Sequence, residues 1–242
     1  MPNFRHAIVV GASSGIGAEL VRQLAQQGCR VAAIARRGDR LKGLAAEFPS
    51  LVIPVEHDVT DYARVPEVFQ KATGDLGGLD LIIYAAGAMP TVGGTEYDFN
   101  KDKVMIDVNV LGAIAWLDQA AVRFQNTKSG SIVAIGSVAG DRGRVGQPVY
   151  NASKAALTTY VEALRNRLSR FGVKVVTIKP GPTETEMTAH LHMKGMMKAE
   201  DVARFILRKS DKTGEFYVKF THRLAFFVIR HFPSWLFRKL SV

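Results

Sequence analysis

The sequence predicts a three-layer α/β fold, in which a doubly wound parallel sheet lies between two layers of helices. Short apolar runs rich in valine and isoleucine alternate with longer segments of helical periodicity, an order typical of parallel sheets. A glycine-rich segment joins the first apolar run to the first helical segment. The length of 242 residues suits one domain with one large core. We therefore expect ligands to bind beyond the carboxyl ends of the strands.

Strands and helices are expected in regular alternation along the chain. The strands are expected at His6–Val10, Arg30–Ile34, Leu51–Val55, Leu81–Tyr84, Ser131–Gly136, Val173–Lys179 and Glu215–Lys219. The helices are expected near Ile16–Gln27, Asp39–Phe48, Tyr62–Thr73, Lys101–Gln125, Tyr150–Arg170 and Ala199–Lys209. No repeat or linker divides the chain, so we expect residues 1–221 to form one folded unit and residues 222–242 to extend it.

Composition is that of an ordinary folded protein, with hydrophobic residues at 47% and charged residues at 22%. The one cysteine, Cys29, cannot form an internal disulfide, which suits a reducing compartment. The first ten residues lack the apolar run and cleavage site of a secretory signal. No stretch approaches the roughly 20 apolar residues that span a bilayer. We therefore expect a cytoplasmic protein without a membrane-crossing helix.

The charge balance is strongly basic, because 32 Lys and Arg against 22 Asp and Glu give a net charge of +10. Such a balance favours anionic partners, namely phosphates, nucleic acid or an anionic membrane surface. A basic solvated surface is the plain alternative. No recognised nucleic-acid motif accompanies the charge, so we expect no nucleic-acid partner.

The glycine-rich segment reads Gly11-Ala12-Ser13-Ser14-Gly15-Ile16-Gly17. Glycines permit a tight turn and a close approach of the backbone to a phosphate. The following helix offers free N–H groups and the positive end of its dipole. A plain strand–helix turn is the alternative, although the position between strand and helix favours a phosphate site. We therefore expect a dinucleotide to contact Gly11, Ser13, Ser14, Gly15, Ile16 and Gly17.

Two arginines, Arg36 and Arg37, follow the second expected strand, where dinucleotide-binding folds read the adenosine ribose. An acidic residue there would bind a free 2′-hydroxyl, whereas arginine binds a 2′-phosphate and can stack on adenine. We therefore predict NADP(H) rather than NAD(H), with a solvated helix start as the alternative. Asp58 and Val59 follow the third expected strand, where Asp58 could accept a hydrogen bond from the adenine amino group.

Tyr150 and Lys154 are four residues apart in an expected helix and therefore lie on the same side of it. An ammonium near a phenol favours the phenolate, so we expect Lys154 to lower the pKa of Tyr150 and make it a general acid and base. Ser137 follows the fifth expected strand, where its hydroxyl could hold the substrate oxygen. Asn109 lies inside a helical pattern, where its amide could hold a water that links Lys154 to solvent.

The chain resembles the single-domain branch of the short-chain dehydrogenase/reductase family. The residues that carry the resemblance are the Gly11–Gly17 loop, Asp58-Val59, Ala85-Ala86-Gly87, Asn109, Ser137, Tyr150 with Lys154, and Pro180-Gly181. As a set they are highly specific, and they extend from residue 7 to about residue 187. The resemblance implies a Rossmann fold of seven strands and hydride transfer between a nicotinamide and a carbonyl or secondary alcohol.

The resemblance also implies roles for these residues. Asn109, Ser137, Tyr150 and Lys154 would form a catalytic tetrad, and Lys154 would in addition bind the nicotinamide ribose. Further cofactor contacts are implied for Asp58, Val59, Ala85, Ala86, Gly87, Pro180, Gly181, Thr183 and Thr185, of which Thr183 and Thr185 lie in the loop that holds the carboxamide.

Two positions depart from the family pattern. Val10 stands where a threonine usually precedes the first loop glycine, which removes one side-chain hydrogen bond. The usual Asn-Asn-Ala-Gly after the fourth strand reads Tyr84-Ala85-Ala86-Gly87, so an asparagine that normally ties the strands together is lost. We expect the support of that loop to differ from the family pattern.

The segment after the sixth strand carries several methionines, Met187, Met193, Met196 and Met197. Methionine suits an apolar substrate or a moving lid, and packing of a mobile loop onto the core is the alternative. His190 and His192 lie in the same segment, but no third ligand is spaced to help them hold a metal. We expect no metal site.

The C-terminal tail mixes bulky apolar residues with basic ones and has no acidic residue after Glu215. Such a segment could lie in a membrane interface, or it could be a subunit contact in a homodimer or homotetramer. The tail, Gly136-Ser137-x2-Gly140-x-Arg142 and Met187-x-Ala189-His190-Leu191 resemble bacterial reductases that act on a decaprenylphosphoryl keto-pentose. That resemblance implies a lipid-linked keto-sugar as substrate and a place at the inner face of the membrane.

Two other functions remain open. One is an enzyme of the same family that acts on a soluble ketone or acyl thioester, with the tail as a dimer contact. The other is a cofactor-sensing regulator on the same fold, although a sensor has no need of Tyr150 and Lys154 in this register.

Overall fold

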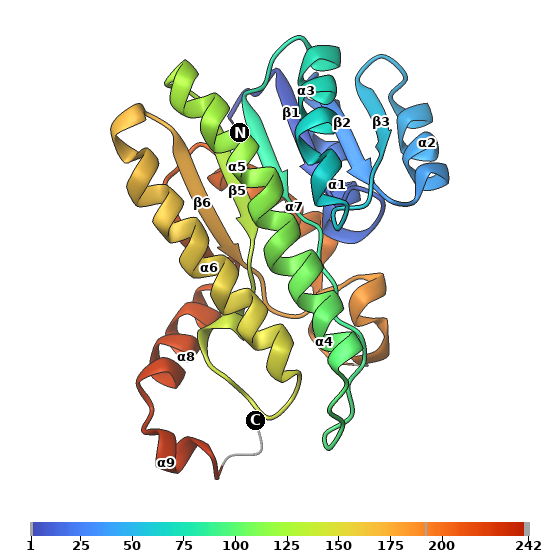
Figure 1. Cartoon of the computed structure of the whole chain (residues 1–242). Helices are drawn as coiled ribbons and strands as arrows, with labels where there is room; N and C mark the ends of the chain where they lie inside the picture. The colour runs from blue at the N-terminus through green and yellow to red at the C-terminus, as the bar shows by residue number, and fades with distance from the viewer. Residues whose placement is uncertain (1, 192, 240–242) are drawn as a thin grey trace.

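The computed structural model describes residues 2–191 and 193–239, and a seven-stranded parallel sheet runs through its centre (Figure 1). The strand order is β3-β2-β1-β4-β5-β6-β9, and each neighbouring pair is parallel. The strands are β1 (His6–Val10), β2 (Arg30–Ala35), β3 (Val52–Glu56), β4 (Leu81–Tyr84), β5 (Ser131–Ile135), β6 (Lys174–Lys179) and β9 (Gly214–Tyr217). The predicted doubly wound sheet is confirmed, and each expected strand overlaps an observed one.

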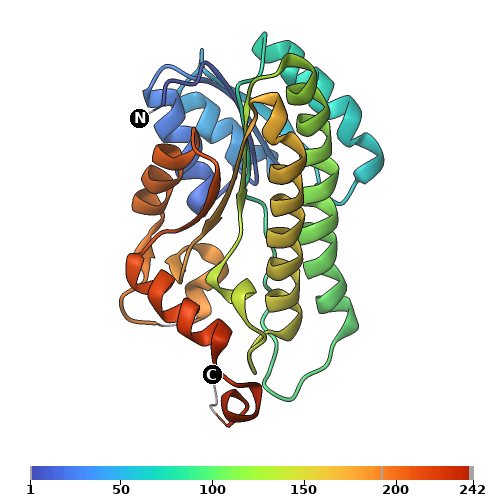
Figure 2. The same ribbon diagram turned by 90° about the vertical axis from the view of Figure 1, so that its left-hand side faces the viewer.

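The helices form two layers around the sheet, as the view along it in Figure 2 shows. They are α1 (Gly15–Gln26), α2 (Gly38–Glu47), α3 (Val65–Leu76), α4 (Phe99–Ile106), α5 (Gly112–Thr127), α6 (Pro148–Leu168), α7 (Ala199–Lys209), α8 (Phe220–His231) and α9 (Ser234–Phe237). Buried side chains of α3, α5 and α6 pack on one face of the sheet, and those of α1, α2 and α7 pack on the other. Because both faces are covered, the central strands read as continuous apolar runs.

Two cores result, one on each side of the sheet. The larger side chains of the first are Phe69, Trp116 and Phe124, which are fully buried or nearly so. The second contains Leu20 and Leu24 of α1, which face the sheet because apolar residues in that helix recur at helical spacing. Each fully buried leucine or phenylalanine contributes roughly 1.5–3 kcal/mol, so these two layers supply the main stabilisation of the fold.

The helix expected at Lys101–Gln125 is not uniform. A π-helical segment, η2 (Asp107–Leu111), separates α4 from α5 and includes Asn109. The whole helical run Phe99–Thr127 is long and apolar enough by composition to cross a membrane, which the sequence analysis did not find. Half of its apolar window is buried inside the protein. It packs against α3, α6 and the sheet, as a core helix does.

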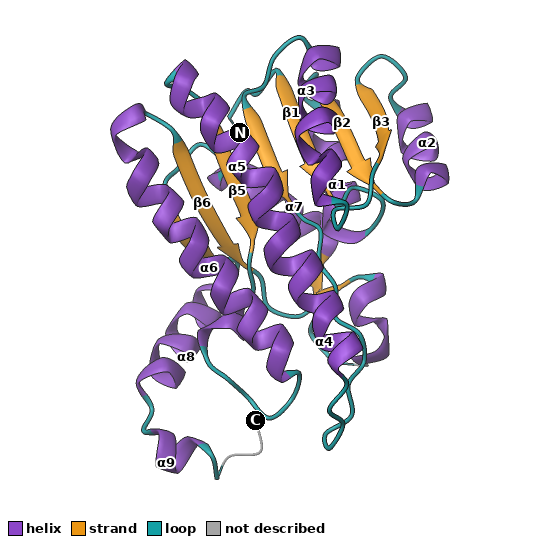
Figure 3. Cartoon of the chain, in the orientation of Figure 1, coloured by secondary structure: helices purple, strands orange, loops and turns teal. Residues whose placement is uncertain are grey.

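The segment after β9 is helical, which the sequence analysis did not predict. The expected strand Glu215–Lys219 ends at Tyr217 as part of β9, and α8 begins at Phe220. In Figure 1, and in Figure 3 coloured by type of element, α8 and α9 lie beyond the carboxyl ends of the strands, near the start of α6. The C-terminal tail is therefore placed at the end of the sheet where ligands bind in this class of fold.

One guanidinium holds this tail to the rest of the protein. Nη1 of Arg142 donates to the carbonyl oxygens of Ile229, Arg230 and Phe232 at 3.0, 3.1 and 2.7 Å. The same guanidinium lies 4.5 Å from the ring centre of Phe237. The carbonyls of Arg230 and Phe232 lie where the end of a helix leaves acceptors without intrahelical partners, so Arg142 acts as a C-terminal cap for α8.

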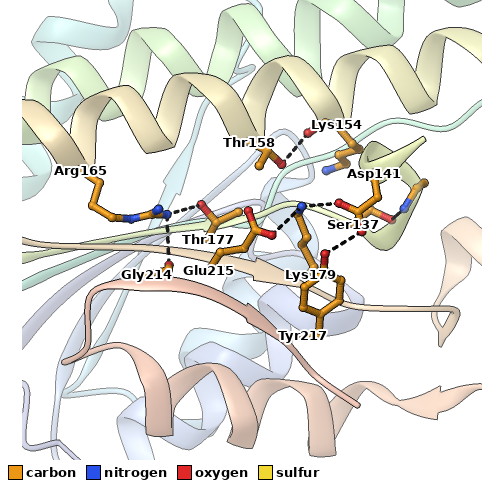
Figure 4. Close-up of polar contacts among 11 residues, drawn as sticks. Ser137, Asp141, Lys154, Thr158, Arg165, Thr177, Lys179, Gly214, Glu215 and Tyr217 are labelled. Carbon is orange, nitrogen blue, oxygen red and sulfur yellow. Dashed lines mark hydrogen bonds and ion pairs between the residues drawn. The ribbon is translucent and has the colours of Figure 1, made fainter. Parts of the chain in front are cut away.

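A buried ion cluster ties the carboxyl end of β6 to the segment that follows β5 and to β9, as Figure 4 shows. Lys179 pairs with Asp141 of the short helix η3 (Val138–Asp141) and, at 2.8 Å, with Glu215 of β9. The hydroxyl of Tyr217 donates to Asp141 at 2.9 Å. Only 2% and 1% of the Lys179 and Asp141 side chains are exposed. Removal of one partner from such a buried pair costs about 3–5 kcal/mol, so the cluster fixes η3 on the sheet.

Candidate active site

A cavity of about 650 Å³ opens at the carboxyl ends of the strands. Loops that follow β1, β2, β3, β4, β5 and β6 line it together with the start of α6. The predicted site residues that line it are Gly11, Ser13, Ser14, Gly15, Ile16, Gly17, Arg36, Arg37, Val59, Ala85, Ala86, Gly87, Ser137, Tyr150, Lys154, Pro180, Gly181, Thr183 and Thr185. Asp58 and Asn109 are not among the lining residues. Parallel strands thus bring side chains from distant parts of the sequence to one edge of the sheet.

The turn after β1 is shaped by glycine. Gly11 has a φ of +90°, and a Cβ atom there would lie 2.4 Å from the backbone nitrogen of Ala86. No other residue fits that approach. Ser14 lies at the N-cap position of α1, yet its side chain forms no capping hydrogen bond. The first amides of α1 thus lack a side-chain cap at an end where the helix dipole favours an anion.

Arg37 lies across this turn and contacts both of its serines. Its guanidinium donates to Ser13 Oγ at 2.9 and 3.1 Å and to Ser14 Oγ at 2.7 Å. It also pairs with Glu186 at 2.7 Å, and Arg40 pairs with the same carboxylate. Hydrogen bonds from Arg37 and Arg40 lower the pKa of Glu186 to about 2. Two guanidinium groups therefore already hold one anionic group at this end of the cavity.

The neighbouring Arg36 is turned toward Asp58 in the loop after β3. Its Nη1 lies 3.8 Å from Asp58 Oδ2, and 70% of its side chain is exposed. Asp58 Oδ1 accepts hydrogen bonds from the amide and hydroxyl of Thr60, both at 2.9 Å. Asp58 is thus engaged with its own loop, and His57 and Val59 line the cavity on either side of it.

Lys154 is buried, with 4% of its surface exposed. Its Nζ donates to the carbonyl oxygen of Ile135 at 3.0 Å and lies 5.8 Å from the ring centre of Tyr150. The predicted proximity of Tyr150 and Lys154 is therefore confirmed. Burial without a carboxylate partner disfavours the charged form and lowers the pKa of Lys154 from 10.5 to about 8.

The expected lowering of the pKa of Tyr150 by Lys154 is wrong for this structure. Burial dominates and raises the pKa of Tyr150, because the phenolate would lose its hydration. A hydrogen bond with Ser137 and the positive charge of Arg144 oppose the rise. Ser137 is itself fixed, because its Oγ accepts from the amide of Ala139 at 3.0 Å. At neutral pH Tyr150 is thus a protonated phenol beside a fixed hydroxyl.

Asn109 is fully buried beneath the cavity. Its Oδ1 accepts from the amide of Ala88 at 2.7 Å, and its Nδ2 donates to the Ala88 carbonyl and to Ser153 Oγ, both at 3.0 Å. The π-helical segment that carries it is a local break of a kind that often marks functional sites. Asn109 thus joins the loop after β4 to α6, one residue from Lys154.

Tyr84 supports the loop after β4 in a different way from the asparagine of the family pattern. Its buried hydroxyl donates to the carbonyl of Val108 in η2 at 2.6 Å. A Cβ atom at Gly112 would lie 2.6 Å from that hydroxyl, so the tyrosine requires glycine there. The loop after β4 is therefore held through Tyr84 and Asn109 together.

The segment after β6 folds back over the cavity. Strand β7 (Thr183–Glu184) pairs with β8 (Met197–Lys198), and the short helix η5 (Glu186–Leu191) lies between them. Thr183 Oγ1 donates to the Gly181 carbonyl at 3.0 Å, and Thr185 contacts Thr188 at 3.1 Å. His192 lies outside the described residues, and among the described ones no group of three His, Cys, Asp or Glu could hold a metal ion.

Several residues in or beside the cavity were missed by the sequence analysis, among them Arg40, Arg144 and Gln147. Arg40 shares Glu186 with Arg37, and Arg144 and Gln147 line the cavity just before Tyr150. The basic run Arg142-Gly143-Arg144 shortly before Tyr150 was the available signal. This run did not predict a cavity residue, because charged residues in a loop are usually solvated.

Comparison with known families is decisive at this point. The family model described as "short chain dehydrogenase" matches residues 5–194, which include the glycine turn, Ser137, Tyr150 and Lys154.

The chain belongs to the short-chain dehydrogenase family.

Its relatives agree with this family assignment. A Myxococcus xanthus protein described only as an uncharacterized oxidoreductase is 36% identical over 228 residues, which cover 92% of this chain and 90% of that protein. A Mycobacterium tuberculosis protein with the same description is 37% identical over 188 residues, 75% of this chain and 74% of that one. This short-chain dehydrogenase is therefore an oxidoreductase by family.

Solved structures share its fold over nearly the whole length. A short chain dehydrogenase from Burkholderia cenocepacia, solved in complex with NADP, has a TM-score of 0.86 at 23% identity and covers 99% of this chain and 98% of its own. A short-chain dehydrogenase from Sphingobium yanoikuyae, solved in complex with NADPH, has a TM-score of 0.84 at 24% identity over 98% and 96%. The seven-stranded sheet of this short-chain dehydrogenase is thus that of a Rossmann fold.

The buried ammonium of Lys154 predicts a pH-dependent stability. Between pH 8 and 10.5 the unfolded chain holds a proton on Lys154 that the folded protein has released, so the folded state gains stability as pH rises. We expect the free energy of unfolding of the cofactor-free protein, minus that of Lys154→Met, to rise by about 2 kcal/mol from pH 7 to 9.5. Urea unfolding at both pH values measures it. Ionisable groups common to both proteins cancel, and equal pH slopes would contradict the assignment.

Proposed function

We propose that this chain is an NADP(H)-dependent reductase that transfers a hydride between the nicotinamide and a carbonyl or secondary alcohol. The observation that carries the proposal is one cavity lined by Ser137, Tyr150 and Lys154 as well as by the turn of Ser13 and Ser14 with Arg37. A proton donor and an anion-binding turn in the same cavity are what such a reaction requires.

The donor set fits a dinucleotide that carries a 2′-phosphate. Arg37 and Arg40 together hold the Glu186 carboxylate, and a 2′-phosphate offers the same kind of partner with more charge. Lys154 lacks a carboxylate partner within the described part of the chain and could donate to ribose hydroxyls. We assign the pyrophosphate to Gly11, Ser13, Ser14, Gly15, Ile16 and Gly17, the adenosine end to Arg36, Arg37, Asp58 and Val59, and the nicotinamide end to Ala85, Ala86, Gly87, Pro180, Gly181, Thr183 and Thr185. Neighbours of the same fold were solved with NADP and NADPH.

The reaction follows from the chemistry of Tyr150. When bound, NADPH supplies the hydride to the carbonyl carbon. The Tyr150 hydroxyl donates its proton to the carbonyl oxygen, and Ser137 Oγ donates a hydrogen bond to the same oxygen. Because burial raises the pKa of Tyr150, the proton is present at neutral pH. The hydrogen bond with Ser137 and the positive charge of Arg144, which oppose the rise in the pKa of Tyr150, favour the phenolate until solvent returns the proton.

The substrate end of the cavity is mostly apolar. Met89, Met187, Leu191 and Met193 line it. Methionines adapt to irregular apolar ligands. We therefore propose an apolar or lipid-linked carbonyl compound as the substrate, such as a lipid-linked keto-sugar. A soluble ketone or acyl thioester is the alternative, and a cofactor-sensing role would leave Tyr150 unused.

Cofactor preference tests the assignment of the arginines. Arg36→Gln and Arg37→Gln each remove a guanidinium expected at the 2′-phosphate, and Arg37 should matter more because it already contacts Ser13 and Ser14. Loss of a charge-assisted hydrogen bond costs about 1.5–3 kcal/mol, or at least tenfold in affinity. We expect Arg37→Gln to weaken NADP binding by that factor and to leave NAD binding unchanged, as measured by titration calorimetry.

A matched control is Lys42→Gln, which removes one exposed charge from α2 and should change neither affinity. Equal affinity of the parent protein for NADP and NAD would refute the preference.

The tail suggests where the enzyme works. We propose that residues 222–242 extend the catalytic domain of residues 1–221 and hold the enzyme at the inner, cytoplasmic face of an anionic membrane. Phe220, Leu224, Phe227 and Val228 recur at helical spacing and are exposed, as is Trp235. No acidic residue follows Glu215, so the only charged residues that α8 and α9 contribute are basic. Each basic residue near an anionic surface contributes about 1 kcal/mol.

Co-sedimentation with vesicles separates the membrane from a subunit contact. Phe227→Glu and Trp235→Glu change side chains that are 63% and 60% exposed, so the fold should survive. We expect the parent to bind phosphatidylglycerol vesicles at low salt, both variants to bind less, and the subunit mass to stay constant. Val122→Glu is the matched control, because Val122 is 63% exposed on α5. A parent that ignores the vesicles, with variants that fall from oligomer to monomer, would identify the tail as a subunit contact.

A further inference from the structure

Arg144 is an arginine of the cavity without an anionic partner. It lines the cavity in the loop before α6, and it forms no ion pair with any carboxylate of residues 2–191 and 193–239. Its Nε is buried and has no hydrogen-bond partner among the described residues, whereas its Nη2 donates to Asn151 Oδ1 at 3.4 Å. Arg36 and Arg37, at the other end of the cavity, each have a carboxylate partner. A desolvated guanidinium without a counter-charge is costly unless a ligand supplies one.

The loop that carries Arg144 is fixed in place. Asn151, which is 2% exposed, donates through Nδ2 to the carbonyls of Arg144 and Gly146 at 3.5 and 3.0 Å. Gln147 starts α6 with a φ of +57° and donates to the carbonyl of Pro90 at 3.3 Å. The loop is thus bound both to α6 and to the segment after β4. Arg144 is held over the cavity rather than left free in solvent.

A second unpartnered polar atom lies in the same loop. Oε1 of Gln147 is buried, lines the cavity and accepts no hydrogen bond from the described residues. Buried polar atoms nearly always have partners, so a donor and an acceptor left open in one loop indicate a ligand. Arg144, Gln147 and Tyr150 line the same cavity near the start of α6, and the positive charge of Arg144 opposes the rise in the pKa of Tyr150.

We propose that Arg144 binds an anionic oxygen group of the substrate beside its carbonyl, and that Gln147 accepts a hydrogen bond from a neighbouring substrate hydroxyl. The substrate class is thereby narrowed to carbonyl compounds that carry a carboxylate, phosphate or phosphodiester. The inference rests on the proposed function, since it names the substrate of the same site. Arg144 acts as a specificity residue, whereas Arg37 and Arg40 serve the cofactor end.

The direct test is anion binding without turnover. Protein saturated with NADP⁺, which occupies Arg37 and Arg40, is titrated with dimethyl phosphate and with trimethyl phosphate, a neutral compound of similar shape. Acetate and methyl acetate form the carboxylate pair and show which anion fits better. One charge-assisted hydrogen bond corresponds to at least tenfold in affinity, so we expect the parent to prefer the anion of one pair by that factor.

Variants assign the preference to Arg144. Arg144→Gln should abolish it, and Arg144→Lys should restore part of it, because lysine keeps the charge but loses the planar fork. Arg167→Gln, an exposed arginine farther along α6, removes the same charge and should keep the preference. A parent that binds anion and neutral compound equally, or a preference that survives Arg144→Gln, overturns the proposal.

Turnover separates this inference from the proposed function. With NADPH, Arg144→Gln should lower kcat/KM for acetoacetate at least tenfold more than for methyl acetoacetate. Equal losses on both substrates would argue for a structural role and against the proposal. If the parent oxidises no NADPH with any carbonyl while the anion preference persists, the proposed function fails and the anion site stands.

Discussion

The buried ion pair between Lys179 and Asp141 is the constraint on which the substrate half of the site depends. It holds η3 against the carboxyl ends of β6 and β9, with Glu215 and Tyr217 as further partners (Figure 4). Ser137 directly precedes η3 in the chain, and Arg142 and Arg144 follow it. Movement of η3 would separate the Lys179–Asp141 pair and leave a buried charge without a partner. The cost of that separation fixes the position of η3.

Three separate functions depend on that fixed segment. Ser137 forms a hydrogen bond with Tyr150 and contributes the hydroxyl that we propose orients the reacting oxygen. Arg142 caps α8 and holds the tail near the cavity. Arg144 offers a guanidinium whose buried Nε has no hydrogen-bond partner among the described residues, in the cavity that Tyr150 also lines. The end of the cavity that we propose for the cofactor is built, in contrast, by the glycine turn, by Arg37 and by the first amides of α1, which belong to the general fold.

Much of this could be predicted from the sequence. Alternating apolar runs predicted the seven strands, and the spacing of Tyr150 and Lys154 predicted their proximity, because helical and strand periods are local rules. The pKa of Tyr150 could not be predicted, since burial outweighs the nearby charges and depends on the assembled cavity. The hydrogen-bond partner of Tyr84 could not be predicted either, because the carbonyl of Val108 is placed near Tyr84 only by the π-helical segment of the folded protein.

The helical structure of the tail and the roles of Arg40 and Arg144 could not be predicted from the sequence for a second reason. Helix α8 was missed because its aromatic and basic composition favoured a surface interpretation, and its cap comes from Arg142, distant in sequence. Arg40 and Arg144 were missed for a similar reason, because a charged loop residue is solvated unless the fold buries it. Only the structure shows that Arg40 shares Glu186 with Arg37 and that Arg144 has no carboxylate partner among the described residues.

The central claim is that Tyr150 supplies the proton in an NADPH-dependent reduction. The most direct measurement is a single turnover of NADPH-loaded Tyr150→Phe with a carbonyl compound that the parent reduces, followed by NADPH absorbance. The phenylalanine ring retains the packing but lacks the hydroxyl. The account predicts a rate at least 10²-fold below that of the parent, as expected for loss of a general acid, with NADPH affinity retained. A rate close to that of the parent would contradict it.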